Sequence, residues 1–424
     1  MNGGDARTTR ALVLHPEFTS DAMRRDPRFA LDEAVALANA LPGLEIAGAE
    51  IVRLAKPTPG KLFGSGKLGD LAHRIAAEDI ELVLINGSVT PVQQRNLERA
   101  WKTKLLDRTG LILEIFSDRA ATREGVLQVE MAALSYQRTR LVRAWTHLER
   151  QRGGLGFVGG PGETQIEADR RAIDEHLTRL KRQLAKVVKT RTLHRAARAK
   201  VPFPIVALVG YTNTGKSTIF NRLTGANVLV KDMLFATLDP TMRAIKLPTG
   251  QEVILSDTVG FISDLPTQLV AAFRATLEEV LSADLILHVR DITHPETDAQ
   301  RDDVLAILEQ LGVGPERASI EVWNKIDQLP AKNRSPLRTT AKRLGNTVVT
   351  SALAKSGLDP LTKAIGQVLD KDRHSHTITL KHEDGRRRAW LYEQSVVVKE
   401  AKTKDGTRFT VRWSNIQAER FSRL

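Results

Sequence analysis

The stretch Pro204–Thr224 reads PIVALVGYTNTGKSTIFNRLT, and the rest of the chain is interpreted from it. The apolar run Ile205–Val209 is followed by Gly210–Ser217 (GYTNTGKS) and then by apolar residues at helical spacing. Strand, glycine loop and helix in this order are the context that a phosphate-binding loop requires. Its backbone N–H groups and the helix N-terminus favour bound phosphate. We therefore expect Lys216 to reach the outer phosphates of a nucleotide and the Ser217 hydroxyl to hold Mg²⁺.

Three shorter motifs follow this loop in a fixed order: DTVG, NKID and SAL. Asp257 is placed to hold Mg²⁺ through water, and the Gly260 N–H to meet the γ-phosphate. We expect Asn324 and Asp327 to recognise guanine, because a carboxylate accepts from the ring N–H and exocyclic amine that adenine lacks. The stem of Lys325 would lie over the base, and backbone donors of SAL would support its edge. Together the four motifs predict GTP as the nucleotide.

The segment LFATLDPTMR is the expected switch loop. Thr237 is our choice for the hydroxyl that closes on Mg²⁺ and the γ-phosphate, and Thr241 is the alternative that the residues alone do not exclude. Phe261 follows DTVG where Ras-like enzymes place a water-orienting Gln. Since Phe cannot orient water, we expect slow hydrolysis unless a partner or an ion assists. Asn213 offers an oxygen for K⁺, although it is equally compatible with an ordinary loop residue.

The candidate site follows from these motifs. The catalytic candidates are Lys216, Thr237 and Gly260, and the metal candidates are Ser217 and Thr237. The expected nucleotide-binding set is Gly210, Tyr211, Thr212, Asn213, Thr214, Gly215, Lys216, Ser217, Thr218, Phe235, Ala236, Thr237, Leu238, Asp239, Asp257, Thr258, Val259, Gly260, Asn324, Lys325, Ile326, Asp327, Ser351, Ala352 and Leu353.

Composition limits the class of protein. The 424 residues are enough for roughly three domains. A net charge of +13 and a pI of about 9.9 favour a polyanionic partner, most often nucleic acid, over a merely soluble basic protein. The absence of cysteine excludes disulfides and thiolate metal sites and is typical of the reducing cytosol. We expect no signal peptide, no membrane span and no zinc site, since no long apolar run and no HExxH motif occur.

The pattern along the chain predicts four parts: an α/β domain at 1–124, a helical hairpin at 125–200, a doubly wound α/β G domain at 201–372 and a small α+β domain at 373–424. In the first part Gly64–Lys67 (GSGK) is interpreted as a helix start and not as a second phosphate loop, although Lys67 could touch RNA. The strands expected there are Ala11–His15, Leu44–Leu54, Glu81–Ile85 and Leu111–Ile115, and the helices are Arg28–Leu41, Lys67–Glu78 and Pro91–Trp101. In the last part Asp405-Gly406 indicates a hairpin turn.

Two long apolar stripes in residues 125–200 predict an antiparallel helical hairpin. Arg140–Lys200 holds 15 Lys and Arg against 6 Asp and Glu. The turn between the helices, Gly153–Gly162, contains six glycines in ten residues, more than a connector needs. With the aromatic Phe157 at its centre, this loop fits insertion into folded RNA. The alternatives are a solvated basic face and an oligomerising coiled coil.

The sequence resembles the HflX family of translation-factor-related GTPases over nearly its whole length. The resemblance rests on LFGSGK, GGLGFVGGPGETQIE, GYTNTGKST, LFATLDPT, DTVGFI and NKID. It implies a cytoplasmic, ribosome-stimulated GTPase that binds the large ribosomal subunit and its rRNA and dissociates or rescues stalled ribosomes. It also supports Thr237 over Thr241, and a hydrophobic residue such as Phe261 is usual at that position in the family.

The competing hypothesis is a GTP-dependent switch in ribosome assembly or signalling that acts through protein partners. In either case we expect Mg²⁺ as cofactor, with K⁺ as a second candidate, GTP and GDP as ligands, and a monomer. The function of the C-terminal part does not follow from its sequence.

Overall fold

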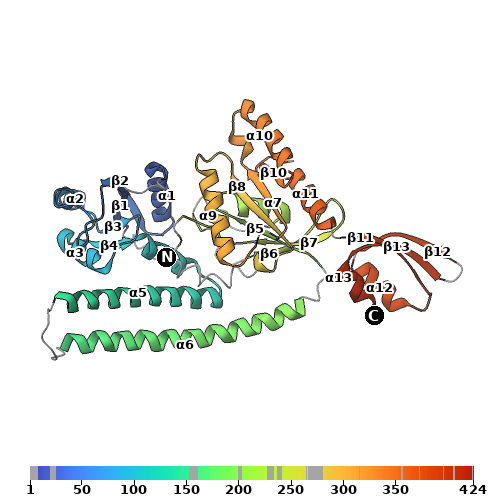
Figure 1. Cartoon of the computed structure of the whole chain (residues 1–424), viewed down its shortest axis with the longest axis horizontal. Helices are drawn as coiled ribbons and strands as arrows, with labels where there is room; N and C mark the ends of the chain where they lie inside the picture. Colours follow the sequence, from blue (N-terminus) through green and yellow to red (C-terminus); the bar gives the residue numbers. More distant parts are fainter. Residues whose placement is uncertain are drawn as a thin grey trace, which may run out of the picture. The chain divides into compact units, whose positions relative to one another are not determined.

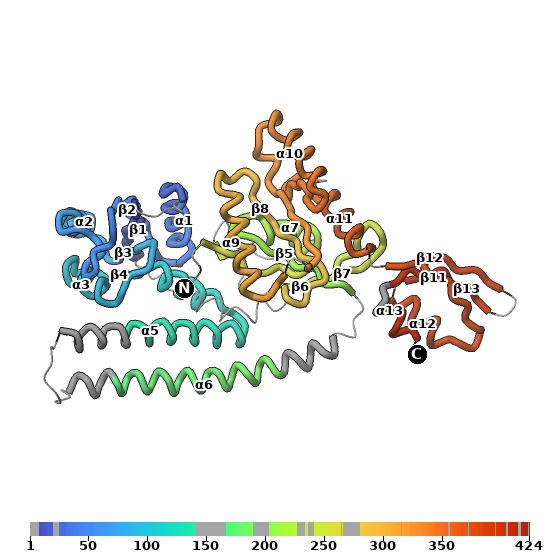
Figure 2. Tube along the Cα trace, in the orientation of Figure 1, coloured from blue at the N-terminus to red at the C-terminus, as the bar shows by residue number. Residues whose placement is uncertain are grey.

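The computed structural model describes residues 8–19, 25–151, 161–198, 203–226, 234–235, 241–263, 265, 280–314, 316–354, 357–371, 373–394, 396–403, 406–422 and 424. The chain divides into two compact units. Unit 1 is Met1–Leu193 with Lys231–Asp239 and Ile262–Thr276, and unit 2 is His194–Val230, Pro240–Phe261 and Leu277–Leu424. Figures 1 and 2 colour the chain along its sequence. The four domain boundaries expected from the sequence stay predictions.

Unit 1 begins with a parallel sheet of order β2-β1-β3-β4. Helices alternate with the strands, as expected (Figure 1). The core combines the inner strand residues with side chains such as Leu71, Leu97 and Trp101. The elements are β1 (Thr9–Phe18), α1 (Pro27–Asn39), β2 (Leu44–Leu54), α2 (Ser65–Ala77), β3 (Leu82–Ile85), α3 (Pro91–Trp101), β4 (Lys104–Asp107) and α4 (Arg108–Arg119).

One element expected in this region was wrong. The run Leu111–Ile115 is not a strand but lies inside α4, and the fourth strand is the preceding β4. Asp107 caps the helix, its side chain accepting from the Gly110 N–H at 2.8 Å. The run Leu111–Ile115 is short and, apart from the exposed Glu114, buried, and periodicity cannot distinguish so short an apolar run in a helix from a buried strand.

The helical hairpin is α5 (Arg123–Gln151) and α6 (Pro161–Arg198), which run side by side in Figure 2. Arg138 and Asp174 join the two helices by an ion pair of 2.7 Å. Asp107 fastens α5 to the sheet domain, because its carboxylate accepts from the Tyr136 hydroxyl and from Arg140 at 2.6 Å. The glycine-rich turn, with Phe157, lies outside the described residues.

Unit 2 contains a six-stranded sheet of order β10-β9-β8-β5-β7-β6, in which only β6 is antiparallel to its neighbour. Its described helices lie on both faces, so this part is the doubly wound P-loop domain expected (Figure 1). The elements are β5 (Ile205–Gly210), α7 (Lys216–Thr224), β6 (Thr241–Lys246), β7 (Glu252–Asp257), β8 (Leu285–Asp291), α9 (Thr297–Gln310), β9 (Ser319–Asn324), η1 (Ile326–Gln328), α10 (Ala331–Leu344), β10 (Thr347–Val349) and α11 (Asp359–Asp370).

The C-terminal part is an antiparallel sheet of order β11-β13-β12 with two helices. Its core is formed by Leu380, Leu391, Phe409, Val411 and Trp413, which lie between the sheet and the helices. The expected α+β architecture is confirmed. The elements are β11 (Arg373–Leu380), α12 (Gly385–Glu393), β12 (Val397–Thr403), β13 (Gly406–Ser414) and α13 (Asn415–Ser422).

Candidate nucleotide-binding site

The sequence motifs lie at one edge of the unit 2 sheet. β5 ends at Gly210, β7 at Asp257, β9 at Asn324, and β10 is followed by Ser351. The strands are parallel, so their carboxyl ends share an edge, which is where open α/β sheets bind ligands. The four motifs are therefore neighbours in space although they span 140 residues of sequence.

The phosphate-loop lysine is fully enclosed. The Lys216 ammonium donates to the Tyr211 carbonyl at 2.6 Å, and burial lowers its pKa to about 8. Gly215 has a φ of +94°, and a Cβ there would lie 2.4 Å from Nδ2 of Asn324. Glycine is required at this position for two reasons, conformation and space. The Lys216 ammonium is therefore enclosed by the backbone of the phosphate loop, where it can bind an anion.

Oxygen donors suited to Mg²⁺ lie beside this lysine. The Ser217 hydroxyl donates to Oδ2 of Asp257 at 2.7 Å, and the Asp257 side chain is fully buried. A hydroxyl next to a carboxylate is a hard-oxygen set of the kind that Mg²⁺ prefers. The donors present therefore fit the metal expected from the sequence. Thr237, the other expected ligand, lies outside the described residues, together with Ala236, Leu238 and Asp239 of the same candidate set.

The segment after DTVG pairs with the phosphate loop. The Thr212 N–H donates to the Phe261 carbonyl at 2.7 Å, and the Phe261 N–H to the Gly210 carbonyl at 3.1 Å. Thus the Thr212 amide, one of those expected to face phosphate, is used within the protein. The Phe261 ring is 3% exposed, and it has no polar group with which to orient water.

The two residues expected to recognise guanine, Asn324 and Asp327, have different surroundings. Asn324 donates to the Thr214 carbonyl at 2.9 Å and accepts from the Ala352 N–H at 3.0 Å, so it links the phosphate loop to SAL. Among the described residues, no hydrogen bond or ion pair engages the half-buried Asp327 carboxylate. Asp327 is thus available to a ligand, whereas the Asn324 side chain already has three protein partners, the third being the Thr350 hydroxyl, which donates to it at 3.3 Å.

The remaining base-site candidates are held by short-range contacts. The Lys325 ammonium pairs with Asp291 at 2.7 Å, and the Lys325 backbone has a φ of +63°. The Ser351 N–H donates to the Gly357 carbonyl at 3.3 Å. The Ala352 N–H also donates within the protein. Of the three backbone N–H groups of SAL, only that of Leu353 has no partner among the described residues. Asp291 was missed by the sequence analysis because it belongs to no recognised motif and acts only through Lys325.

Two other contacts missed by the sequence analysis hold the switch flanks inside unit 1. Arg119 of α4 donates to the carbonyls of Leu234 and Phe235, the latter at 2.6 Å. The Phe235 ring packs against Phe116, with centroids 4.6 Å apart. Arg108 donates to both oxygens of Ser263, at 2.9 and 3.0 Å. Phe235 makes these contacts within unit 1, and its expected place at the nucleotide stays a prediction; no sequence pattern pointed to the two arginines.

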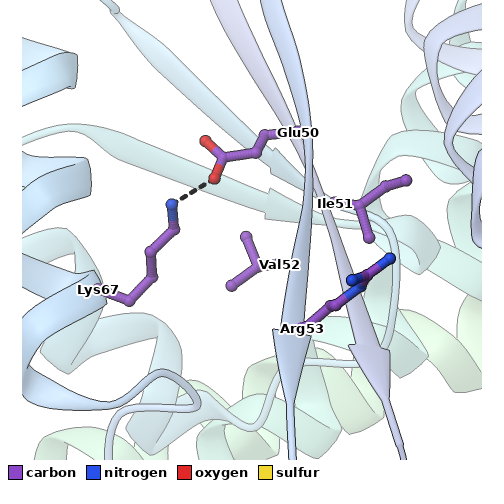
Figure 3. A pocket seen from close by; sticks show the side chains of 5 residues that line it. All are labelled: Glu50, Ile51, Val52, Arg53 and Lys67. Carbon is purple, nitrogen blue, oxygen red and sulfur yellow. Dashed lines mark hydrogen bonds and ion pairs between the residues drawn. The ribbon is translucent and has the colours of Figure 1, made fainter.

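The Gly64–Lys67 segment is a helix start, as predicted: α2 begins at Ser65 with Gly64 as its cap. A hollow of about 430 Å³ lies beside it, lined by Glu50, Ile51, Val52, Arg53 and Lys67 (Figure 3). The Lys67 ammonium forms an ion pair with Glu50 across this hollow (Figure 3). Arg74 also pairs with Glu50, at 3.0 Å, and with Glu78, and Arg53 pairs with Glu17, so each of these basic groups already has a carboxylate partner.

The fold and the site together define a guanine-nucleotide-binding P-loop GTPase. Three family profiles match: "GTP-binding GTPase N-terminal" at residues 29–117, "GTP-binding GTPase Middle Region" at 119–198 and "50S ribosome-binding GTPase" at 205–325. In the part of the chain that the structure describes, no helix is long and apolar enough to cross a membrane.

Several curated relatives match almost the full chain. A protein named GTPase HflX from Magnetococcus marinus is 49% identical over 94% of this chain and 90% of its own length. GTPase HflX of Escherichia coli is 41% identical over 94% of this chain and 92% of its own length. GTPase HflX of Caldanaerobacter subterraneus is 43% identical over 84% and 82%. The chain belongs to the HflX family of GTPases, and its enzymatic activity is the hydrolysis of GTP.

Proposed function

We propose that this chain is a Mg²⁺-dependent GTPase that binds the large ribosomal subunit, dissociates stalled ribosomes and is stimulated by them. The observation that carries the proposal is that one chain of this family contains both a GTP site and a long basic helical hairpin. Arg179, Arg182 and Lys186 are exposed on α6 and line a hollow of about 710 Å³. Exposed cations on a rigid helix suit the phosphates of rRNA.

The nucleotide chemistry is assigned as follows. Lys216 would neutralise charge on the β- and γ-phosphates, and Asp327 would select guanine through its two acceptor oxygens. Ser217 and Thr237 would ligate Mg²⁺, which stabilises developing negative charge on the phosphates, and Asp257 would hold it through water. The Gly260 N–H would contact the γ-phosphate. The buried Phe261 orients no water, so hydrolysis would be slow until a ribosome, or K⁺ near Asn213, completes the site.

The hairpin would make the ribosomal contact. Its glycine-rich turn with Phe157 would enter folded RNA, where close backbone approach and base stacking are favourable. The protein would act as a monomer in the cytoplasm, since the basic faces of the hairpin suit RNA better than a second copy of the same charge.

The test is sedimentation through sucrose gradients of ribosomes mixed with the protein and GTP, a non-hydrolysable GTP analogue or GDP. We expect the analogue to bring the protein to the large subunit and to raise the fraction of free subunits. Salt should weaken this binding steeply, because Lys and Arg contacts to phosphate release counterions.

A charge-matched pair of variants makes this test specific. Arg179→Gln with Arg182→Gln should lose ribosome binding and ribosome-stimulated hydrolysis, while basal hydrolysis stays unchanged. The control Lys332→Gln with Arg338→Gln removes two exposed cations from α10 and should behave as wild type. If the wild-type protein binds neither subunit but captures an assembly or signalling protein, the competing hypothesis of a protein-directed switch replaces this one.

A further inference from the structure

The C-terminal sheet has two faces of opposite character. Along β13, Phe409, Val411 and Trp413 are buried, whereas Arg408, directly before Phe409, and Arg412, between Val411 and Trp413, are exposed. The buried residues pack with α12 and α13, which lie on one side of this sheet in Figure 1. No described helix or strand of residues 373–424 covers the other side, and we call it the outer face.

Strand register gives the composition of the outer face, because residues directly opposite each other in an antiparallel pair share a face. Arg408 is opposite Thr379 and Ala401, Thr410 is opposite Thr377 and Lys399, and Arg412 is opposite Ser375. Apart from the half-buried Thr410, these side chains are exposed. The face therefore carries guanidinium, ammonium and hydroxyl groups, and none of its described residues is acidic.

The acidic residues of this domain that the structure describes lie outside the outer face. Arg373–Leu424 holds twelve Lys and Arg against six Asp and Glu. Glu400, between Lys399 and Ala401, points to the helix side, where it pairs with Arg388 at 2.9 Å and accepts from Tyr392. At one end of the outer face Asp370 approaches Arg412 at 3.6 Å. Arg408 and Lys399 form no ion pair among the described residues, so positive charge dominates the centre of the face.

The aromatic residues are also on the helix side. Trp390, Trp413 and Phe421 pack on one another with ring centroids 5.1 to 6.4 Å apart, and Arg387 lies over Phe421. Tyr392 contacts Phe409 on the same side. The outer face thus offers no aromatic surface on which an unpaired base could stack, and single-strand recognition depends on such surfaces.

We infer that the outer face of the C-terminal sheet binds the sugar–phosphate backbone of double-helical RNA, at a site separate from the helical hairpin. Arg408 and Lys399 would contact phosphates, and the hydroxyls of Thr377, Thr379 and Thr410 would bond to phosphate oxygens and 2′-hydroxyls. Double-stranded RNA is recognised by such shape-dependent, largely sequence-independent contacts. The choice of RNA among polyanions rests on the proposed ribosomal function, whereas the charge and the hydroxyl groups are properties of the face itself.

The experiment compares full-length wild type with Arg408→Gln/Lys399→Gln and the control Lys332→Gln/Arg338→Gln. The probe is a labelled RNA duplex of about 16 base pairs, titrated at several salt concentrations. We expect the first double variant to lose at least about tenfold in affinity at 0.1 M salt and to reduce the salt slope by about 2. The control should change neither. Both double variants should keep wild-type GTP hydrolysis, which shows that they fold.

Other probes identify the polyanion. A single-stranded RNA and a DNA duplex of the same length should show a smaller loss, because one lacks the helical backbone and the other the 2′-hydroxyls. Equal losses for RNA and DNA duplexes would overturn the RNA assignment, and a larger loss for single-stranded RNA would overturn the duplex assignment. If the variant equals its control while wild type binds the duplex, the inference fails and the hairpin proposal stands. If wild type binds neither RNA nor ribosomes, both proposals fail.

Discussion

At the scale of single residues, the nucleotide site separates groups already engaged by the protein from groups left for a ligand. Asn324 and Ala352 bond to each other and stabilise the loops. The Asp327 carboxylate, which has no partner among the described residues, and the Lys216 ammonium, which keeps further donors besides its bond to the Tyr211 carbonyl, are two charged groups that a nucleotide can use. Two predictions concern these residues.

We expect Asp327→Asn to move base preference from GTP toward xanthosine triphosphate. An amide presents a donor where guanine needs an acceptor, whereas the xanthine carbonyl accepts from that donor. The loss of GTP affinity should be at least about 10²-fold, since a buried polar pair is left unmatched. Competition binding with both nucleotides measures it, and Glu309→Gln on the exposed face of α9 controls for charge. Unchanged guanine preference would show that the base lies elsewhere.

We expect GDP affinity to fall as pH rises above about 8. Burial lowers the pKa of Lys216 to about 8, so the nucleotide-free protein loses the ammonium above that pH. Only the charged form attracts phosphate, and bound phosphate raises the pKa again. Affinity should therefore be constant near neutrality and decrease by about tenfold per pH unit above pH 8. Titration with a fluorescent GDP analogue tests this. The Lys216→Met variant should bind GDP weakly, and its affinity should not decrease above pH 8. The control Lys246→Met, on β6, should show the same pH dependence of GDP affinity as wild type.

At the scale of elements, α4 contacts several segments of unit 1 that are far apart in the sequence. At its start, Asp107 bonds to Arg140 of α5, and Arg108 bonds to Ser263. At its end, Arg119 bonds to the carbonyls of Leu234 and Phe235. The Arg119 guanidinium also donates to the Ala40 carbonyl at 2.7 Å, and burial lowers its pKa although the charge of Asp118 acts in the opposite direction. Helix α4 thus holds the start of the expected switch loop in two ways: Arg119 bonds to the backbone carbonyls of the loop, and Phe116 packs against the Phe235 ring.

Arg119→Ala should loosen residues 234–235. Three carbonyls lose a charged donor, which we expect to cost about 2 kcal/mol of local stability. Hydrogen exchange followed by mass spectrometry should show faster exchange in the peptide that covers Phe235, with partial recovery in Arg119→Lys. The exposed Arg123 at the start of α5 provides the control Arg123→Ala. Equal exchange rates in wild type and Arg119→Ala would mean that other contacts hold this segment.

The elements also show how far sequence patterns reach. The phosphate loop and NKID follow the strands expected for them, because each requires fixed residues at fixed spacing, next to strands that parallel pairing brings to one edge. The misassigned Leu111–Ile115 is too short an apolar run to show helical periodicity, and the cap of its helix, Asp107, was not recognised. The contacts of Arg119 and Arg108 could not be predicted, because they bind main-chain oxygens over 115 and 155 residues of sequence separation.

At the scale of the whole molecule, the two units have separate cores. Nucleotide bound at the unit 2 site should stabilise that unit by about 2.7 kcal/mol at a concentration of 100 times Kd. We therefore expect calorimetry to show more than one transition, of which GDP shifts one most strongly. In Asp327→Asn that shift should disappear for GDP and return with xanthosine diphosphate. A single transition in wild type would show that the units unfold together.

The composition of unit 1 has a consequence for biosynthesis. Phe116 and Arg119 are translated long before Leu234 and Phe235, which contact them from beyond the end of α6. The 116 residues by which Phe235 follows Arg119 take about 6 to 23 seconds to synthesise. During that interval the end of α4 has an uncovered aromatic ring and a guanidinium without its two later acceptors. These last contacts of unit 1 therefore form only after the phosphate loop has been synthesised.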